Sequence, residues 1–181
     1  MNESTQLTPP ISERDHSAGN TNAPVTLVEY GDYQCPYCGE AHPVVKQLQR
    51  DLGKRLRFVF RNFPLTQAHP FALVAAEGAE AAALQGKFWE MHDYIYEHQD
   101  ELEPDILPVW AQQIGLDLKA FGVAIKDGKI TERIKEDRTS GIRSGVNGTP
   151  CFFINDSRYD GDADYEPLKA ALEEQITIRK I

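Results

Sequence analysis

The sequence predicts an α/β fold in which a βαβ unit and a later ββα unit are separated by a long, all-helical insertion. Three observations support this fold. Two short, β-branched and apolar runs, 25–30 and 55–60, flank a segment whose apolar residues have helical spacing. From about residue 68 to residue 144 helical spacing continues, and strand signals return only at 151–155. The 181 residues are enough for one domain, or for one domain with a large insertion.

The βαβ unit comes first. Residues 25–30, VTLVEY, are short and mostly apolar, as in a buried strand. A helix is expected to begin directly after Cys35, because proline suits the first helical position and Pro36 occupies it. Pro43 lies inside this helix, so a kink is predicted there. The next strand is 55–60, RLRFVF, and such a strand–helix–strand connection is right-handed by default.

The insertion is predicted to consist of amphipathic helices that begin or end at proline, aspartate or glycine. Their aromatic residues are interpreted as core, because burial of such residues is what an amphipathic helix needs. The expected helices span 68–85, 88–95, 104–115, 117–128 and 130–142. After them, 151–155 and 158–160 are expected to pair as a hairpin, and Asp164 is expected to cap a closing helix that reaches residue 176.

This organisation divides the chain into three parts. Residues 1–22 are mostly polar and contain prolines, which predicts a flexible N-terminal arm. Residues 23–65 and 146–181 are expected to form the α/β domain together, and residues 66–145 the inserted helical domain.

Composition and charge limit the kind of partner. With 41% hydrophobic and 26% charged residues, the chain has the composition of a globular protein. A net charge of -9 argues against nucleic acid as a partner, and no run approaches the ~18 apolar residues that membrane insertion needs. No basic start precedes an apolar run, so the sequence as it stands predicts a cytoplasmic protein. Removal of a signal peptide, or a different start, would make it an exported, periplasmic one.

The segment from Cys35 to Cys38, CPYC, lies at the junction of a predicted strand and helix, which is a redox pattern. A cysteine at a helix N-terminus faces unpaired N–H groups and the positive end of the helix dipole. Both favour the thiolate, which is the attacking species in disulfide exchange. Cys35 is therefore expected to be the exposed nucleophile and Cys38, one turn later, the resolving thiol. Between them Pro36 stiffens the turn, and Tyr37 adds no positive charge, so a weaker oxidant is expected than from a pair with histidine.

Glu29 is a candidate proton acceptor for Cys38. It lies on the strand before the cysteines, and its neighbours Val28 and Tyr30 point to the opposite face. This alternation allows Glu29 to lie beneath the cysteine pair, where burial would raise the pKa of its carboxyl. An ordinary glutamate at the edge of the core is the alternative that spacing alone leaves open.

Three segments together resemble the DsbA-like thiol–disulfide oxidoreductases of the thioredoxin superfamily. They are 23–38, APVTLVEYGDYQCPYC, then 145–150, GVNGTP, and 152–162, FFINDSRYDGD. The resemblance runs from about residue 16 to residue 176 and includes a helical block inserted into a thioredoxin-like fold. It implies exchange of the cysteine pair with protein or low-molecular-weight thiols and disulfides, through a mixed-disulfide intermediate. It also implies a redox recycling partner, and no cofactor is expected.

The resemblance also assigns residues. The family's nucleophilic and resolving cysteines fall on Cys35 and Cys38, and its buried acidic residue falls on Glu29. Pattern alone predicts a trans bond before Pro150, because only about one X–Pro bond in twenty is cis. The resemblance instead implies a cis bond beside the disulfide, with the backbone of Thr149 open to strand-like pairing with substrate. The predicted substrate-binding residues are Thr149, Pro150, Pro36 and Tyr37.

The third cysteine, Cys151, follows that proline. Strand alternation is expected to turn it away from the disulfide. A small buried apolar thiol is one interpretation, because free cysteine is so often buried. A third redox-active thiol is the other.

Two rival functions use the same cysteines. CPYC is also the pair of glutaredoxins, so a glutathione-linked reductase is one alternative, and the direction of electron flow stays open. A metal or iron–sulfur module that uses Cys35 and Cys38 is the other. Such a site needs further ligands, for which only Cys151 and His42 are at hand, so no metal site is predicted.

Overall fold

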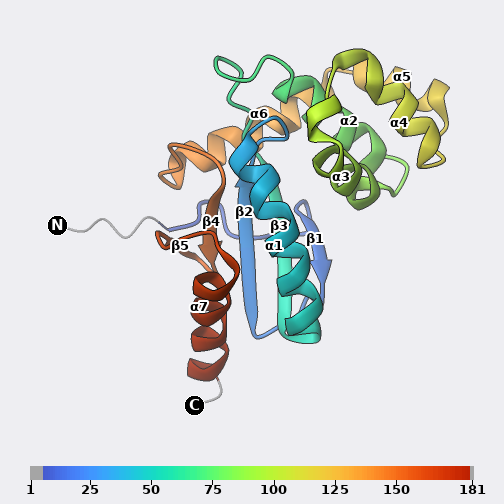
Figure 1. The fold of residues 1–181 in the computed structure, drawn as a ribbon. Helices are drawn as coiled ribbons and strands as arrows, with labels where there is room; N and C mark the ends of the chain where they lie inside the picture. Colours follow the sequence, from blue (N-terminus) through green and yellow to red (C-terminus); the bar gives the residue numbers. More distant parts are fainter. Residues whose placement is uncertain (1–5, 180–181) are drawn as a thin grey trace.

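The computed structural model describes residues 6–179 and is built around one five-stranded sheet (Figure 1). The strands are β1 His16–Gly19, β2 Val25–Gly31, β3 Leu56–Asn62, β4 Cys151–Ile154 and β5 Ser157–Tyr159. The helices are α1 Pro36–Leu52, α2 Ala72–Ala83, α3 Phe88–Glu97, α4 Leu107–Gln113, α5 Leu118–Lys126, α6 Lys129–Arg143 and α7 Tyr165–Ile178. Short 3₁₀ turns lie at Gly53–Arg55, Gln99–Glu101 and Pro104–Ile106. The predicted α/β fold with βαβ and ββα units is confirmed.

The sheet has the order β1-β3-β2-β4-β5. β2 and β3 run parallel, as a βαβ connection through α1 requires, and the other neighbouring pairs are antiparallel. β2 is therefore covered by a strand on each side, and Glu29 lies between Phe60 of β3 and Phe152 of β4. β2 is thus the central strand of the sheet, and the short loop that follows it leads directly to the N-terminus of α1.

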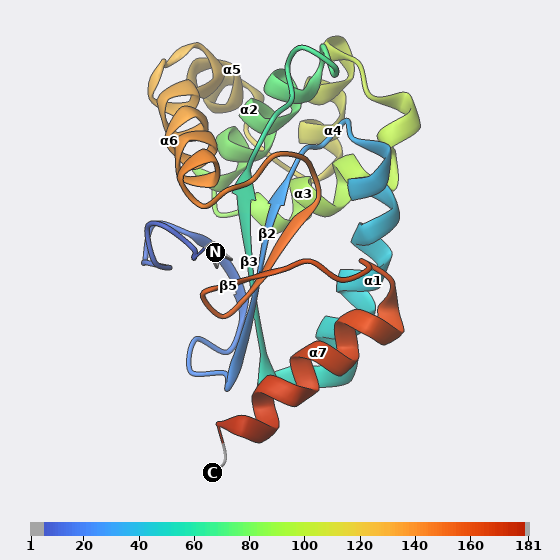
Figure 2. The same ribbon diagram turned by 90° about the vertical axis from the view of Figure 1, so that its left-hand side faces the viewer.

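Each face of the sheet buries its own set of side chains. On one face, Val25 and Leu27 pack in a large cluster with α1 and α7, whereas Val28 and Tyr30 belong to a smaller cluster on the other face. Figure 2 shows α1 and α7 on one side of the sheet, with the N-terminal segment and α6 on the other side. The alternation along β2 thus decides which residues face α1.

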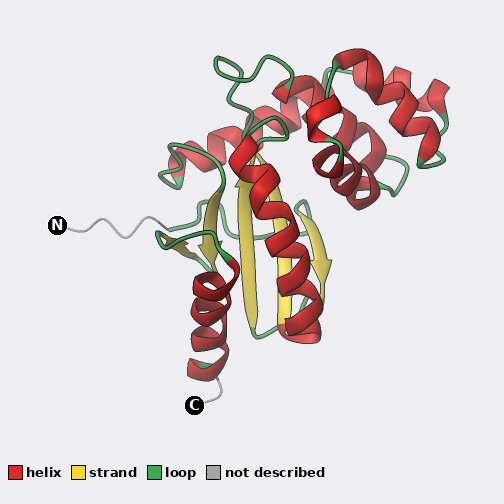
Figure 3. Ribbon diagram, in the orientation of Figure 1, coloured by secondary structure: helices red, strands yellow, loops and turns green. Residues whose placement is uncertain are grey.

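The helical insertion lies beyond one end of the sheet. Figure 3 shows α2–α5 gathered there, and α6 leads the chain back toward β4. The helices match the predicted segments, with shifts at their starts: α2 begins at residue 72 because residues 66–71 form turns. Asp117 caps α5 by accepting a hydrogen bond from the Ala120 N–H at 2.7 Å. Asp164 stands at the N-cap of α7 without such a bond. Within residues 6–179, no helix combines the length and the apolar character needed to cross a bilayer.

Residues 6–22 differ from the expected flexible arm, and residues 1–5 lie outside the described part of the chain. Residues 16–19 form β1 and pair with β3, and Leu7 is buried beneath the sheet. Asp15 also forms a buried ion pair with Arg61 of β3, at 2.7 Å between Oδ1 and Nε. Backbone pairing holds this segment, together with the ion pairs of Asp15 with Arg61 and of Arg14 with Glu136 and the contact of His16 with Glu80. The polar composition of residues 6–22 does not indicate pairing with distant residues, which explains why this segment differs from the expected flexible arm.

We expect Asp15→Ala to lower the free energy of unfolding by about 3–5 kcal/mol, because Arg61 would remain buried without its carboxylate. Arg61 is only 3% exposed and otherwise contacts carbonyl and hydroxyl oxygens. Urea unfolding measures the loss. Lys135→Ala removes a partner from an exposed pair with Glu132 and should change little. Equal effects of the two substitutions would contradict a structural role for the 6–19 segment.

Candidate active site

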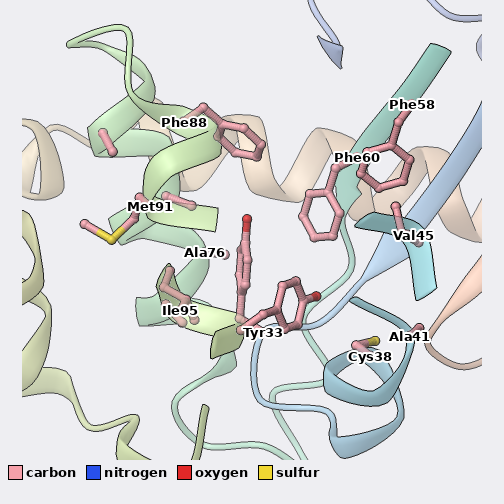
Figure 4. Packing of buried hydrophobic residues seen from close by; sticks show 14 of the residues in the cluster. Tyr33, Cys38, Ala41, Val45, Phe58, Phe60, Ala76, Phe88, Met91 and Ile95 are labelled. Atoms are coloured by element: carbon pink, nitrogen blue, oxygen red, sulfur yellow. The ribbon is translucent and has the colours of Figure 1, made fainter. Parts of the chain in front are cut away.

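The cysteine pair lies where β2 passes into α1. Cys35 is the N-cap residue of α1 and Pro36 opens the helix, as predicted. The N–H groups of Cys38 and Gly39 both donate to the carbonyl of Cys35 at 3.1 Å, which closes the first turn. Figure 4 shows Cys38 within the buried cluster that also holds Ala41, Val45 and Phe60. The two cysteines therefore lie three residues apart on the first turn of α1, and Cys35 is the outer one.

Cys35 is less exposed than the sequence predicts, at 3%, while Cys38 is fully buried. The loop before β4 covers the outer cysteine: the carbonyl oxygen of Thr149 lies 3.4 Å from the Cys35 sulfur. Tyr37, next in the chain, is 69% exposed. A groove of about 280 Å³ separates Tyr37 from Thr149 and Pro150. Cys35 therefore lies at the edge of the core, beside this groove, rather than on open surface.

Opposite pKa shifts distinguish the two thiols. The pKa of Cys35 is lowered from 9.0 to about 5, chiefly because the Cys38 thiol donates a hydrogen bond to its sulfur. The Thr149 side chain and the first backbone N–H groups of α1 add smaller effects in the same direction, and burial opposes them. Burial raises the pKa of Cys38 well above its usual value, and its bond to Cys35 and the charge of Glu29 raise it further. At neutral pH the outer sulfur is a thiolate and the inner one a thiol.

Glu29 lies on the cysteine side of β2, in the alternation predicted from the sequence. It is 2% exposed, and its Oε1 atom has no hydrogen-bond partner among the described residues. Burial raises the pKa of its carboxyl from 4.5 to about 8, and the negative charge of Cys35 adds to the rise. A carboxyl with that pKa exchanges its proton near neutral pH, as a general base for a thiol must. Its role toward Cys38 stays a prediction.

The loop before β4 reaches the pair from the far end of the sequence. The Thr149–Pro150 peptide bond is cis, as the resemblance implies, so the trans bond expected from pattern alone is wrong. Frequency favours trans for an isolated X–Pro bond, and only the tertiary setting decides otherwise. Thr149 and Pro150 are both half-buried and line the groove with Tyr37, while Pro36 is exposed at its helix start.

Cys151 lies apart from the pair. It belongs to the buried cluster on the opposite face of the sheet, with Val28 and Tyr30, and it is 5% exposed. Burial also raises the pKa of its thiol, which keeps it protonated at neutral pH. The sheet thus separates it from Cys35 and Cys38. Its redox activity stays a prediction, and this placement favours the apolar interpretation.

Sequence reasoning missed two residues that hold the cysteine loop. Both oxygens of the buried Asp32 carboxylate accept bonds at 2.8 Å, from the N–H groups of Gln34 and Leu65. The side-chain amide of Gln99, from the insertion, donates to the carbonyls of Tyr33 and Cys35 at 2.8 and 2.9 Å. Gln99 is 64 residues from Cys35, so no local pattern could have identified it.

A group of potential metal ligands lies deeper in the same core. His42, His92 and Asp93 bring their ligand atoms within 4.8 Å of one another. Each already has a partner: His42 and Lys46 contact Asp93 at 3.0 and 2.6 Å, and His92 bonds the Tyr33 hydroxyl at 2.9 Å. The group contains neither Cys35 nor Cys38, so it differs from the cysteine-based metal module considered above.

We expect Glu29→Gln to raise the stability of the reduced protein at neutral pH. Because the folded-state pKa lies above the usual 4.5, the folded protein holds a proton that the unfolded chain releases. The unfolding free energy of the wild type therefore falls between pH 4.5 and about 8 through this group. Glutamine does not titrate, so the stability of the variant relative to the wild type should be greater at pH 7 than at pH 4, by up to about 3 kcal/mol. Denaturant unfolding of both proteins at both pH values measures this difference in unfolding free energy, and Glu174→Gln, at an exposed position, is the control.

We expect Gln99→Ala to raise the pKa of Cys35, because the N-cap carbonyl would lose the bond that holds the first turn in place. The pH dependence of iodoacetamide alkylation should move from a midpoint of about 5 in the wild type toward about 6, the equivalent of one lost hydrogen bond. Gln112→Ala, an exposed substitution elsewhere in the insertion, should leave the midpoint unchanged. Equal midpoints in all three proteins would show that Gln99 does not position the Cys35 thiol.

Comparison with known proteins supports the same fold. The thioredoxin family model matches residues 12–174. The structure is similar to that of a thioredoxin-like oxidoreductase from Silicibacter pomeroyi DSS-3, with a TM-score of 0.79 and 27% identity over 94% of this chain and 95% of that one. It is also similar to oxidised BdbD from Bacillus subtilis, with a TM-score of 0.81 and coverage of 93% and 96%. At 23% identity, that second likeness shows the fold alone.

The curated relatives of this chain are named for a different activity from that of the similar solved structures. The chain is 48% identical over 166 residues to Na(+)/H(+) antiporter NhaA 1 of Salinispora arenicola, which covers 92% of this chain and 25% of that protein. NhaA 1 of Mycobacterium sp. strain KMS is 41% identical over 171 residues, 93% of this chain and 28% of that protein. The chain thus spans about a quarter of the length of these relatives. The family match and the fold show that this chain belongs to the thioredoxin family, with the fold of the DsbA-type thiol–disulfide oxidoreductases.

Proposed function

We propose that the chain is a thiol–disulfide oxidoreductase that exchanges its Cys35–Cys38 dithiol or disulfide with substrates through a mixed disulfide at Cys35. One observation carries the proposal: a thiolate with a pKa of about 5 at the N-terminus of α1, with a buried, protonated thiol one turn behind it. A thiolate near a groove supplies the nucleophile, and the second thiol supplies the means to release the substrate.

The exchange proceeds in two displacements. The Cys35 thiolate attacks one sulfur of a substrate disulfide, and the other substrate sulfur leaves as a thiolate. Cys38 then loses its proton and attacks the Cys35 sulfur, so the Cys35–Cys38 disulfide forms and the second substrate thiolate leaves. The pair is oxidised by two electrons, the substrate is reduced by two, and the one proton lost by Cys38 ends on one of the two substrate thiolates. Run backward, the same steps transfer a disulfide to a dithiol substrate.

The groove beside the cysteines is the proposed substrate surface. Tyr37 forms one wall, and Thr149 and Pro150 form the other. The backbone of Thr149 precedes β4 at its free end, where an extended substrate chain can pair as a strand would. Proteins and low-molecular-weight disulfides both fit this description, and a separate redox partner must return the pair to its starting state.

The direction of electron flow depends on the reduction potential. Tyr37 brings no positive charge near Cys35, so we propose a potential between the about −270 mV of thioredoxin and the about −120 mV of DsbA. A value near the reducing end would favour the alternative of a glutathione-linked, glutaredoxin-like reductase. The antiport activity in the names of the curated relatives is not part of the proposal, because a dithiol at a helix N-terminus supports thiol–disulfide exchange and not cation transport.

Substitution of the cysteines tests the proposal. With glutathione disulfide as substrate, Cys38→Ser should accumulate a Cys35–glutathione adduct visible by mass spectrometry, because the first displacement occurs and the second does not. Cys35→Ser should form no adduct and lose at least about 1,000-fold in exchange rate.

Cys151→Ala is the matched control, because it removes a thiol on the other face of the sheet. Unchanged exchange in this variant would identify Cys35 and Cys38 as sufficient. Activity that persists in Cys35→Ser, or an adduct on Cys38 in its place, would overturn the proposed mechanism.

A further inference from the structure

Apart from Oγ1 of Thr149, in the loop beside Cys35, two buried oxygens near the cysteine pair have no hydrogen-bond partner among the described residues. They are Oε1 of Glu29 and the hydroxyl of Tyr96, and the two residues are 2% and 6% exposed. Buried polar groups are almost always paired, so each exception calls for an explanation in terms of function or strain. Glu29 already has a candidate role, whereas Tyr96 has none.

The ring of Tyr96 lies against the part of α1 that carries Cys38. Tyr96 is near the end of α3, and its ring stacks on that of His42 with 5.2 Å between centroids. His42 follows Cys38 by four residues in α1, so the two share one face of the helix. The ring of Tyr33, from the loop before the cysteines, lies 5.0 Å from that of Tyr96.

Tyr96 also lies toward the strand that carries Glu29. Its ring is 6.4 Å from that of Phe60, the residue paired with Glu29 across the sheet. Gly31 leaves room for the Glu29 carboxyl, because a Cβ atom on residue 31 would lie only 3.0 Å from Oε1 of Glu29. After burial itself, the charges of Cys38 and Glu29 are the largest influences that raise the pKa of the Tyr96 hydroxyl. The Tyr96 ring, the Glu29 carboxyl and Cys38 therefore border the same part of the core, and in this structure no hydrogen bond joins the Tyr96 hydroxyl to either group.

The other titratable groups around this region are occupied. Asp32 accepts two backbone bonds and contacts His69, and the imidazoles of His42 and His92 contact Asp93 and the Tyr33 hydroxyl. Cys35 accepts the hydrogen bond from Cys38. The groups that face Tyr96 are thus Cys38, Glu29, Tyr33, Asp32, His42 and His92. Of these and Tyr96 itself, Glu29 and Tyr96 have an oxygen that is free to form a new bond.

We propose that Tyr96 is a positioning residue for the resolving step, in which its hydroxyl acts with the Glu29 carboxyl to take the proton from Cys38. The inference rests on the proposed function, because it concerns the second displacement. In that step the Cys38 S–H bond breaks and the ionised, carboxylate form of Glu29 receives the proton, while the Tyr96 hydroxyl donates a hydrogen bond to the charge that moves between them. The Cys38 thiolate then attacks the Cys35 sulfur and expels the substrate thiolate. No external reductant or oxidant enters the step beyond the substrate disulfide.

A two-phase reaction isolates this step. Reduced protein is mixed with 5,5′-dithiobis(2-nitrobenzoate), whose coloured thiolate is released once when Cys35 attacks and once more when Cys38 resolves the mixed disulfide. For Tyr96→Phe we expect an unchanged first phase. We expect a second phase slower by about tenfold or more at pH 7, because a hydrogen bond to a charged group is lost. The pH profile of the second phase should also shift. Tyr94→Phe, the same change two residues earlier in α3, should match the wild type in both phases.

A double-variant cycle tests whether Tyr96 acts through Glu29. If it does, Tyr96→Phe should slow the second phase little when Glu29→Gln is already present. Effects that multiply in the double variant would overturn the coupling. A Tyr96→Phe protein with the rate and pH profile of Tyr94→Phe would overturn the inference.

The outcomes separate this inference from the proposed function. Absence of a first phase in the wild type would contradict the proposed function. A normal first phase with a second phase that does not respond to Tyr96→Phe would contradict only the role of Tyr96.

Phenylalanine keeps the shape of the ring and deletes an unpaired oxygen, so the Tyr96→Phe variant is expected to fold, and its Tm checks this. Tyr96→3-fluorotyrosine keeps the hydroxyl but makes it more acidic. It should shift the pH profile of the second phase without slowing the first, and an unshifted profile would count against the inference.

Discussion

The N-terminus of α1, set directly at the end of β2, is the constraint on which the rest of the site depends. It places Cys35 at the N-cap and buries Cys38 one turn later against the sheet. A single hydrogen bond between the two thiols then has opposite effects on them, because it stabilises charge on the outer sulfur and holds the proton on the inner one. The proposed division into nucleophile and resolving thiol rests on position and burial, since the two residues are chemically identical.

Burial on the cysteine face has a second consequence, at Glu29. Period-two alternation along β2 directs Val28 and Tyr30 to one face and leaves Glu29 on the other, among apolar side chains. The carboxyl loses solvation there and tends to hold its proton near neutral pH. An element that lowers stability, an unpaired buried carboxyl, thereby becomes a group able to exchange protons in the pH range where thiols react.

The helical insertion supports the site as well as covering it. Gln99 bonds the carbonyls at the start of the cysteine loop, and Tyr96 packs against α1 beneath the pair. Both residues come from the end of α3 and the turn that follows it. The insertion therefore contacts the cysteine loop through the end of α3 and the turn after it, and also through His69 and His92, which contact Asp32 and the Tyr33 hydroxyl.

The local features of this protein follow from its sequence, because each has a local physical cause. Proline after Cys35 marks a helix start, Asp117 marks a cap, and alternation along 25–30 places Glu29 on the cysteine face. Contacts between distant segments, in contrast, become visible only in the folded chain. The fold covers Cys35 with Thr149, 114 residues away, and it pairs the polar segment before β2 with β3. Contacts of this kind depend on how the whole chain closes around the sheet, and neither spacing nor composition within a short window encodes them.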